Sequence, residues 1–444
     1  MAEQQPPTPG RLLSVLGLAF GLAGSVGGTI GAGILRTPGL VAAQLHSPAW
    51  IMGIWLVGGL YALLGANCIA ELAACLPRAG GWYVYATEAF GRRFGLVVGW
   101  CDWLAHCIGL AWVATTLGDY LNPGIGLDAH LIAIAVLLLF GAIQGLGVKA
   151  GGASQELLSL AKALAFLGLV GGCFLLTPSS SAANALAEAP HGPPGVLATV
   201  LALQAVITTY DGWASPVYFA EEFSDPSRDL PRSLIGGVLA VLALYLLFNG
   251  ALLHVLPMDA LAQAALPAAD AATLLLGAKA GWLITALALV ALTGLMNTVV
   301  MAAPRILYGL GRDGLLPPVT AQVNPGGTPI PALLLTLVAS TLLVLIGSFE
   351  RLLAMGAFVY VALPLTGLAA LAHLRTSQPG MQRPFHCWGY PVTPGVVGVI
   401  SLGFLGGCLL EDPLNSLLAV GLITAGAGVA AVSLPNATVK PSGL

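Results

Sequence analysis

The feature that most constrains the fold is a series of long apolar segments that fills almost the whole chain. A helix needs about 17 to 25 predominantly apolar residues to cross a bilayer. Hydropathy and helix breakers define twelve such segments: 12–42, 48–75, 94–121, 130–148, 154–176, 195–222, 232–256, 280–303, 331–348, 352–374, 393–410 and 413–433. Only 8% of the residues are charged, against about 25% in soluble domains. The sequence therefore predicts an all-α integral membrane protein with twelve transmembrane helices.

Basic residues lie almost entirely on one side of these segments. When the connecting loops alternate between sides, twelve Lys and Arg residues fall on the side that holds both termini. Three fall on the opposite side, Arg36, Lys279 and Arg351, and Lys162 lies within a segment. The positive-inside rule then places both termini in the cytoplasm. We expect a multi-pass protein of the cell (cytoplasmic) membrane.

The first apolar segment contains five glycines within residues 24–34, GSVGGTIGAGI. Each glycine in a helix interior costs roughly 1 kcal/mol relative to alanine, so an uninterrupted helix is disfavoured here. Backbone that is not helical is tolerated at membrane depth only where it is buried in protein or lines a polar cavity. The ends of two half-helices would present N–H groups to a carboxylate and carbonyl groups to a cation. Close helix packing through small residues would also explain the glycines, without a ligand.

The sixth apolar segment contains a second interruption at residues 207–216, ITTYDGWASP. An Asp, a Gly and a Pro follow one another within six residues of an otherwise apolar span, which favours unwinding. Segments one and six are the first members of two sets of five. Interruptions at corresponding places in two halves indicate an inverted repeat with a binding site at its interface. The two breaks together predict a binding site in mid-membrane.

Several longer motifs resemble those of the amino acid–polyamine–organocation (APC) superfamily. They are GTIGAGI at 28–34, ELAACLPRAGGWYVY at 71–85, YDGW at 210–213, AEE at 220–222, RDLPR at 228–232 and RILYGLGRDGLLP at 305–317. They stand in the order that the superfamily has and extend over the first three quarters of the chain. The DGW variant is similar to the L-type branch, which forms heterodimeric transporters, and to its bacterial relatives.

The resemblance implies the five-plus-five inverted-repeat fold of the sodium-coupled neurotransmitter transporters, with helices one and six broken. It also implies alternating access to an amino acid held between the two breaks. The expected parts are a cytoplasmic tail (1–11), a ten-helix transport core (12–374) made of two repeats (12–176 and 195–374), two peripheral helices (393–433) and a second cytoplasmic tail (434–444).

The resemblance further implies which residues bind the substrate. Backbone N–H groups of Ala32 and Gly33 would hold its carboxylate, and carbonyls near Thr29, Thr208 and Asp211 would hold its ammonium. The expected set is Thr29, Ile30, Gly31, Ala32, Gly33, Thr208, Tyr210, Asp211, Gly212 and Trp213. Many relatives carry an aromatic residue at the position of Thr208 and a hydroxyl at that of Ala32. These departures predict a wider or more polar pocket.

Two ionisable residues within spanning segments each allow two interpretations. Asp211 either contacts the substrate, favours a cationic side chain or titrates, or it caps the second half of helix six. Lys162 resembles a lysine that occupies the place of a coupling sodium in some bacterial relatives, which argues against sodium dependence. It could instead be a structural cation bonded to carbonyls of helices one and eight. Tyr210 and Trp213 either cover the substrate or pack in the interior.

Other charged residues are expected to form pairs. Asp102 and His106 are four residues apart, and we favour a structural pair over a proton relay. The candidate inner-gate residues are Glu222, Arg228 and Arg232. The predicted ion pairs are Glu221 and Glu222 with Arg228 and Arg232, and Glu71 with Arg78.

The sequence thus predicts a secondary amino acid transporter that is proton-coupled or an exchanger and does not use sodium. The alternative is a permease for a polyamine or another amine metabolite on the same fold. An enzyme is disfavoured because the chain has no HExxH or CxxC motif and no recognisable nucleophile–base spacing within the membrane. A gated channel and a substrate receptor are two further classes, and the paired breaks favour a carrier over a continuous pore.

The expected partners are an amino acid substrate, the lipid bilayer and protons as the candidate coupling ion. No basic–aromatic patch indicates nucleic acid. We expect no cofactor and no metal, because the seven cysteines lie mostly in apolar segments without metal-ligand spacing. Animal L-type relatives are linked to an accessory subunit through an extracellular cysteine. Residues 122–129 contain none, so we predict no disulfide-linked accessory subunit.

Overall fold

The computed structural model describes residues 11–31, 33–176, 194–277, 280–346 and 349–411, together with a few single positions after them. Within these ranges the chain is helical apart from its connections and one isolated bridge between Leu16 and Phe223. The elements are α1 (Leu18–Thr29), α2 (Gly33–Leu45), α3 (Pro48–Cys75), α4 (Trp82–Phe90), α5 (Arg92–Ile125), α6 (Ala129–Gly145), α7 (Val148–Leu176), α9 (Val196–Tyr210), η1 (Ser215–Glu222), α10 (Pro226–Val255), α11 (Met258–Gln263), α12 (Pro267–Leu276), α13 (Gly281–Arg312), η3 (Pro318–Ala321), α14 (Ile330–Ile346), α15 (Phe349–Ser377) and α16 (Val392–Glu411).

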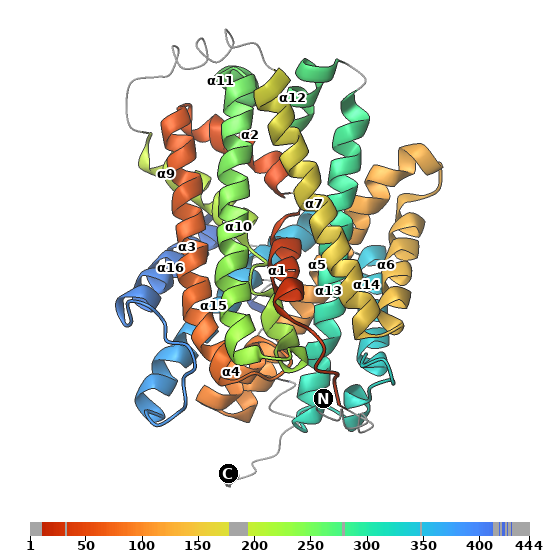
Figure 1. Cartoon of the computed structure of the whole chain (residues 1–444), viewed down its shortest axis with the longest axis vertical. Coiled ribbons are helices and arrows are strands. Elements are labelled where there is room, and N and C mark those ends of the chain that lie inside the picture. The colour runs from red at the N-terminus through yellow and green to blue at the C-terminus, as the bar shows by residue number, and fades with distance from the viewer. Residues whose placement is uncertain are drawn as a thin grey trace, which may run out of the picture.

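The long helices run along the long axis of the molecule, with α4 at one end and α11 and α12 at the other (Figure 1). The short helix α1 lies in the interior, in contact with α7, α10 and α13. Its buried residues are mostly small, including Gly24, Ser25, Gly27 and Gly28. Small side chains let the backbones of neighbouring helices approach closely. As a result, the glycine-rich segment lies at the centre of the bundle.

Eight helices in the described ranges are long and apolar enough to cross a membrane: α3, α5, α7, α9 continued by η1, α10, α13, α15 and α16. The bent pair α1 and α2 would make a ninth. The helices α6 and α14 are apolar but have 17 residues each. The expected segment 413–433 lies outside the described residues except for a few single positions. The all-helical, multi-pass architecture is confirmed, whereas the count of twelve helices and the inverted repeat stay predictions.

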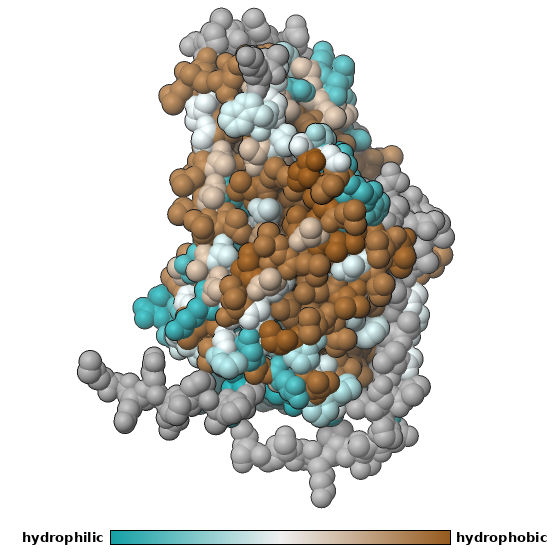
Figure 2. Space-filling model, turned by 90° about the vertical axis from the view of Figure 1, so that its right-hand side faces the viewer, coloured by the Kyte–Doolittle hydropathy of each residue, from teal (hydrophilic) through white to brown (hydrophobic). Residues whose placement is uncertain are grey.

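The face of the bundle seen in Figure 2 is apolar over a broad band at mid-height, with polar residues gathered toward the ends. Large hydrophobic side chains on α6, α7 and α14 are exposed, among them Leu138, Leu164 and Leu342. In water such a continuous apolar face would favour aggregation. Around a membrane protein it is the surface that meets the lipid.

Candidate substrate site at two broken helices

The first predicted break is present and separates α1 from α2. The two helices are bent by 48° relative to each other, and Ile30 has an extended backbone. Ala32 lies outside the described residues, so its expected role in carboxylate binding stays a prediction. Gly33 begins α2 and is exposed. The first N–H groups of a helix lack intrahelical acceptors, so this end of α2 can accept an anion.

The carbonyl end of α1 is bonded by the ammonium of Lys162 from α7. Lys162 Nζ donates to Gly27 O at 3.0 Å and to Ile30 O at 2.5 Å, and the side chain is fully buried. Gly294 of α13 makes room for it, since a Cβ there would lie 3.0 Å from Nζ. A cation is favourable at this position because carbonyl dipoles converge at the end of a helix.

The second predicted break is also present, and the chain resumes after it as a 3₁₀ helix. The helix α9 ends at Tyr210, and η1 begins at Ser215. Between them Gly212 has φ +99°, a backbone conformation that glycine adopts readily. No side chain caps η1, so the interpretation of Asp211 as a helix cap is not supported.

The two breaks are packed directly against each other. A Cβ on Gly28 would lie 2.6 Å from Gly212 O, so glycine is required where the two backbones meet. Ser25 Oγ donates to Trp213 O at 3.0 Å. The Thr37 and Thr209 hydroxyls are 2.8 Å apart and join α2 to α9. These contacts place the ends of the four half-helices around one point.

The hydroxyl of Tyr245, on α10, connects the carbonyl ends of both broken helices. It lies 3.2 Å from Thr29 O and 3.2 Å from Thr209 O, and it can donate to either. The Tyr245 ring packs edge-to-face against Trp55, with centroids 5.5 Å apart, and at a tilt against Tyr210, at 4.9 Å. The Tyr210 hydroxyl donates to Trp55 O at 3.1 Å. Tyr210 is therefore held in the interior, and it also lines a cavity beside the second break, so both interpretations of this residue stay open.

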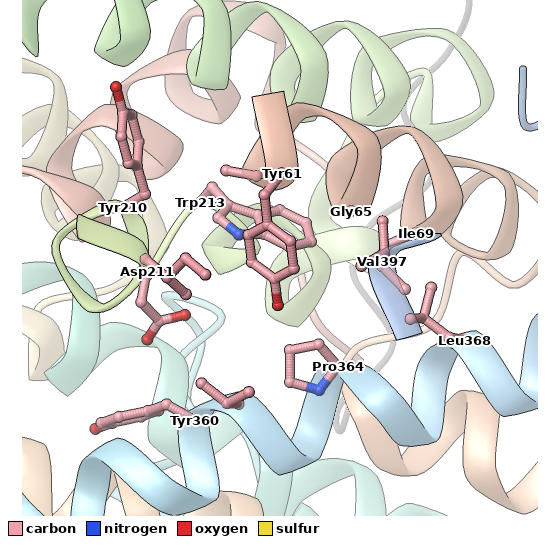
Figure 3. Close-up of a pocket in the computed structure, with 13 residues that line it drawn as sticks. Tyr61, Gly65, Ile69, Tyr210, Asp211, Trp213, Tyr360, Pro364, Leu368 and Val397 are labelled. Carbon is pink, nitrogen blue, oxygen red and sulfur yellow. The ribbon is translucent and has the colours of Figure 1, made fainter. Parts of the chain in front are cut away.

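A narrow cavity of about 30 Å³ lies beside the second break. It is lined by residues of α3, α9, α15 and α16 and of the break itself, including Tyr61, Asp211, Trp213 and Tyr360. The Asp211 carboxylate points away from Tyr210 toward Tyr360 and Pro364 (Figure 3). A cavity of this size holds one or two water molecules. It would have to widen before a side chain larger than a methyl group could enter.

The expected substrate-binding residues are therefore divided between the first break and the cavity. Thr29, Ile30 and Gly33 lie at the first break, while Tyr210, Asp211 and Trp213 line the cavity. Thr208 is exposed, and its hydroxyl donates to Gln204 O at 2.9 Å.

Ion pairs close the end of the bundle that carries α4 and most of the basic loops, which we call the basic end. Glu222 and Arg305 form a fully buried bidentate pair, with N–O distances of 2.9 and 3.0 Å. Arg312 pairs with Glu221 and with Asp313. The predicted pairing was wrong here, because Arg228 and Arg232 are exposed and form no ion pair within the described residues.

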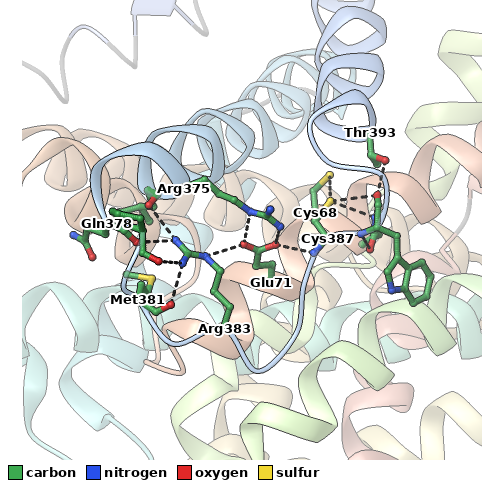
Figure 4. A network of polar contacts seen from close by, with 12 residues as sticks. Cys68, Glu71, Arg375, Gln378, Met381, Arg383, Cys387 and Thr393 are labelled. Atoms are coloured by element: carbon green, nitrogen blue, oxygen red, sulfur yellow. Dashed lines mark hydrogen bonds and ion pairs between the residues drawn. The ribbon is translucent and has the colours of Figure 1, made fainter.

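Glu71 is likewise paired differently from the prediction. It binds Arg375 at 2.5 and 2.9 Å, lies 3.2 Å from Arg383 and accepts from the Cys387 N–H (Figure 4). Arg78 instead pairs with Asp313 at 2.5 Å. Glu71 thus fastens the connection between α15 and α16 to the end of α3.

The family model for amino acid permeases matches residues 11–427. The chain belongs to the amino acid permease family. It is 28% identical to the serine/threonine exchanger SteT of Bacillus subtilis over 93% of this chain and 94% of that protein. It is 26% identical to the human b(0,+)-type amino acid transporter 1, over 86% of this chain and 80% of the relative. For the human large neutral amino acids transporter small subunit 2 the identity is 28%, over 83% and 71%.

Membership of the permease family agrees with the resemblance on which the site was predicted. Two residues of this permease were nevertheless missed from sequence. Tyr245 lies in an unbroken apolar helix, where its only signal is a phenol hydroxyl within the membrane. Arg305 was assigned to a loop, whereas it lies inside α13 and is fully buried.

Proposed function

We propose that the chain is a secondary active amino acid transporter that works by alternating access. The observation that carries this proposal is the close packing of two broken helices, whose N–H and carbonyl ends have opposite polarity. An α-amino acid carries a carboxylate and an ammonium on one carbon, so it matches these two kinds of helix end. The relatives, all transporters or exchangers of amino acids by name, support the same substrate class.

In the proposed complex the substrate carboxylate binds N–H groups at the start of α2, including those of Ala32 and Gly33. The ammonium binds carbonyls around Thr29, Thr208 and Asp211. The backbone at Ile30, Gly31 and Gly212 is not helical in this proposal, which leaves these N–H and carbonyl groups available to the substrate. Trp213 lines the adjoining cavity.

We further propose that transport does not use sodium. The carbonyl end of α1, where a coupling cation would be favourable, is already bonded by Lys162. Tyr245 supplies a second donor that reaches both carbonyl ends. Lys162 then acts as the coupling residue that takes the place of a metal ion, and a proton gradient or an exchanged amino acid supplies the driving force.

The side chain of the substrate would enter the cavity beside Asp211. A carboxylate in this position favours a polar or cationic side chain over a purely apolar one. The alternative substrate, a polyamine or another amine metabolite, would use the same carboxylate. It has no carboxyl group to bind the start of α2, so we favour an amino acid.

The proposed topology follows the positive-inside rule, with both termini in the cytoplasm of a cell-membrane protein. The basic end is then cytoplasmic, and Glu222 belongs to its closed gate. The proposed architecture comprises two repeats at 12–176 and 195–374 and peripheral helices over 393–433. We expect the transporter to work without a disulfide-linked subunit.

The test is uptake of labelled serine, leucine and arginine into proteoliposomes that contain the full chain. Each amino acid is measured in sodium and in choline buffer, with and without an inward pH gradient, and with and without unlabelled amino acid inside. Protein-free vesicles are the control, and putrescine is the probe for the alternative substrate.

We expect saturable uptake of at least one amino acid at equal rates in sodium and choline. Stimulation by the pH gradient would indicate symport, and a requirement for internal amino acid would indicate exchange. Uptake of putrescine with no movement of any amino acid would overturn the proposed substrate class. Uptake that requires sodium would overturn the role of Lys162.

A further inference from the structure

Three titratable side chains form a buried cluster next to the cavity. Asp102 and His106 lie one turn apart on α5, and Tyr218 reaches them from η1. The Tyr218 hydroxyl donates to Asp102 Oδ1 at 3.0 Å, and His106 Nδ1 lies 3.2 Å from the same oxygen. Asp102 is fully buried, His106 is 8% exposed, and the His106 and Tyr218 rings are 4.7 Å apart. The sequence pattern predicted the Asp102–His106 pair, and the geometry adds Tyr218.

The hydrogen bonds within the cluster do not use one carboxylate oxygen of Asp102 and one ring nitrogen of His106. Asp102 Oδ2 is buried and has no hydrogen-bond partner in the described part of the chain. His106 Nδ1 lies 2.8 Å from Asp102 O, a contact that requires a hydrogen on Nδ1 because a carbonyl only accepts. Nε2 is then the nitrogen that can gain or lose a proton. A purely structural ion pair would be expected to satisfy both carboxylate oxygens, because an unpaired buried oxygen is costly.

The cluster is connected to the substrate cavity on two sides. Tyr218, which donates to Asp102, lies on η1, the helix that follows the second break. Tyr360, which lines the cavity, donates to Ala105 O at 2.9 Å, one residue before His106. The titratable groups that face the pair are Tyr218 from η1, Tyr360 from α15, Asp211 from the break, and Cys101 and Cys107 on α5 itself. Among these groups, Asp211 is a carboxylate and can also act as a base.

We propose that Asp102 and His106 form the proton-binding site that couples proton movement to transport, an inference that rests on the proposed transport function. The proton binds at His106 Nε2, where it turns neutral imidazole into imidazolium, and it leaves from the same nitrogen. Asp102 stabilises the imidazolium from the other side of the ring. The charge beside the substrate cavity thus changes each time His106 is protonated or deprotonated.

The test measures amino acid and proton fluxes together in proteoliposomes of the full chain that contain the pH-sensitive dye pyranine. Labelled serine, leucine and arginine are the probes, added outside at matched pH. His106→Gln keeps a side chain that can hydrogen-bond but cannot carry the proton. His130→Gln is the matched control, because His130 also lies 3.6 Å from an aspartate, Asp128, but is half exposed on α6.

For the parent and His130→Gln we expect the vesicle lumen to acidify as amino acid enters. For His106→Gln we expect at least about a tenfold lower proton flux per amino acid, a factor that corresponds to roughly 1.4 kcal/mol. Exchange of internal for external amino acid at fixed pH should persist in this variant. Tyr218→Phe removes one hydrogen bond to Asp102 and keeps the ring, so it should shift the midpoint of the pH profile of uptake.

Three results would overturn the inference. One is an unchanged ratio of proton to amino acid flux in His106→Gln. Another is a parent that exchanges amino acids without moving protons, which would leave the proposed function intact. The third is a parent that moves no amino acid, in which case the proposed function fails first. If His106→Gln cannot be purified as a folded protein, an unshifted pH profile in Tyr218→Phe overturns the inference instead.

Discussion

At the break between α1 and α2 the carbonyls of Gly27 and Ile30 accept from the ammonium of Lys162, whereas at the break between α9 and η1 the carbonyl of Thr209 is reached only by the neutral hydroxyl of Tyr245 among the described side chains. The first break carries a buried positive charge. The second carries the acidic side chain of Asp211 at the edge of a cavity. The two breaks therefore both interrupt a helix but have opposite electrostatic character. A ligand with both charges can be oriented between them, and substitutions at the two breaks should have different consequences.

The largest effect is expected where the breaks touch. Gly212→Ala would place a side chain at φ +99° and against the carbonyl of Gly28. The left-handed conformation alone costs about 1–2 kcal/mol for a residue with a Cβ. We expect uptake to be abolished and the unfolding temperature in detergent to fall. Gly250→Ala is the control, because a Cβ there meets nothing within 4 Å. Parent-like uptake by Gly212→Ala would show that the breaks do not need this close approach.

Removal of the buried ammonium should have the next largest effect. Lys162→Met leaves two buried carbonyls without their donor, at about 1–3 kcal/mol for each unsatisfied group. We expect uptake to fall by at least about tenfold, since 1.4 kcal/mol corresponds to a factor of ten. Lys149→Met, at an exposed position at the start of the same helix, should be neutral. If sodium restored uptake to Lys162→Met, the ammonium would be replaceable by a metal ion. Unchanged uptake without sodium would contradict its role.

A selective effect is expected at the acidic break. Asp211→Asn removes the charge at the cavity and keeps the size of the side chain. We expect uptake of labelled arginine to fall more than uptake of serine, by about threefold to tenfold, because the lost attraction acts on the cationic side chain alone. Competition between the two amino acids measures the ratio directly. The exposed Asp259 on α11 provides the matched control, Asp259→Asn. An equal loss for both substrates would place Asp211 outside the side-chain pocket.

The smallest effect is expected at Tyr245, whose hydroxyl contacts one carbonyl at each break. Tyr245→Phe removes one hydroxyl and keeps the ring that packs against Trp55 and Tyr210. A typical hydrogen bond contributes about 0.5–1.5 kcal/mol, so uptake should fall by about twofold to tenfold. The substrate affinity and the maximal rate are measured separately, because the hydroxyl contacts both broken helices. Identical values of both quantities in the variant would show that the shared hydroxyl is dispensable.

Both breaks could be predicted from the sequence because their causes are local. Five glycines in one segment, and Asp211, Gly212 and Pro216 in another, disfavour a continuous helix whatever surrounds them. The apolar segments follow from composition in the same way. Lys162 was identified because a charge within a membrane helix is costly and therefore conspicuous.

The partners of the charged residues could not be predicted, because they depend on distant parts of the chain. Glu222 binds Arg305, 83 residues away, and Glu71 binds Arg375, 304 residues away. The prediction paired each acid with an arginine close to it in sequence, and the fold brings other arginines nearer. The contact of the Tyr245 hydroxyl with two carbonyls likewise depends on how α1, α9 and α10 pack together. It could not be predicted from the sequence of one segment.

The hydroxyl of Tyr245 has one hydrogen and lies equally far from two carbonyls. At any instant one of the two accepts this hydrogen and the other does not. The ammonium of an arriving substrate has three hydrogens and can satisfy the carbonyl that is left without one. With substrate bound, both carbonyls would then have a donor, whereas the single hydrogen of Tyr245 serves one of them at a time. Under the proposed function, such a site would favour reorientation with substrate bound over reorientation of the empty protein, which is the kinetic condition for one-for-one exchange.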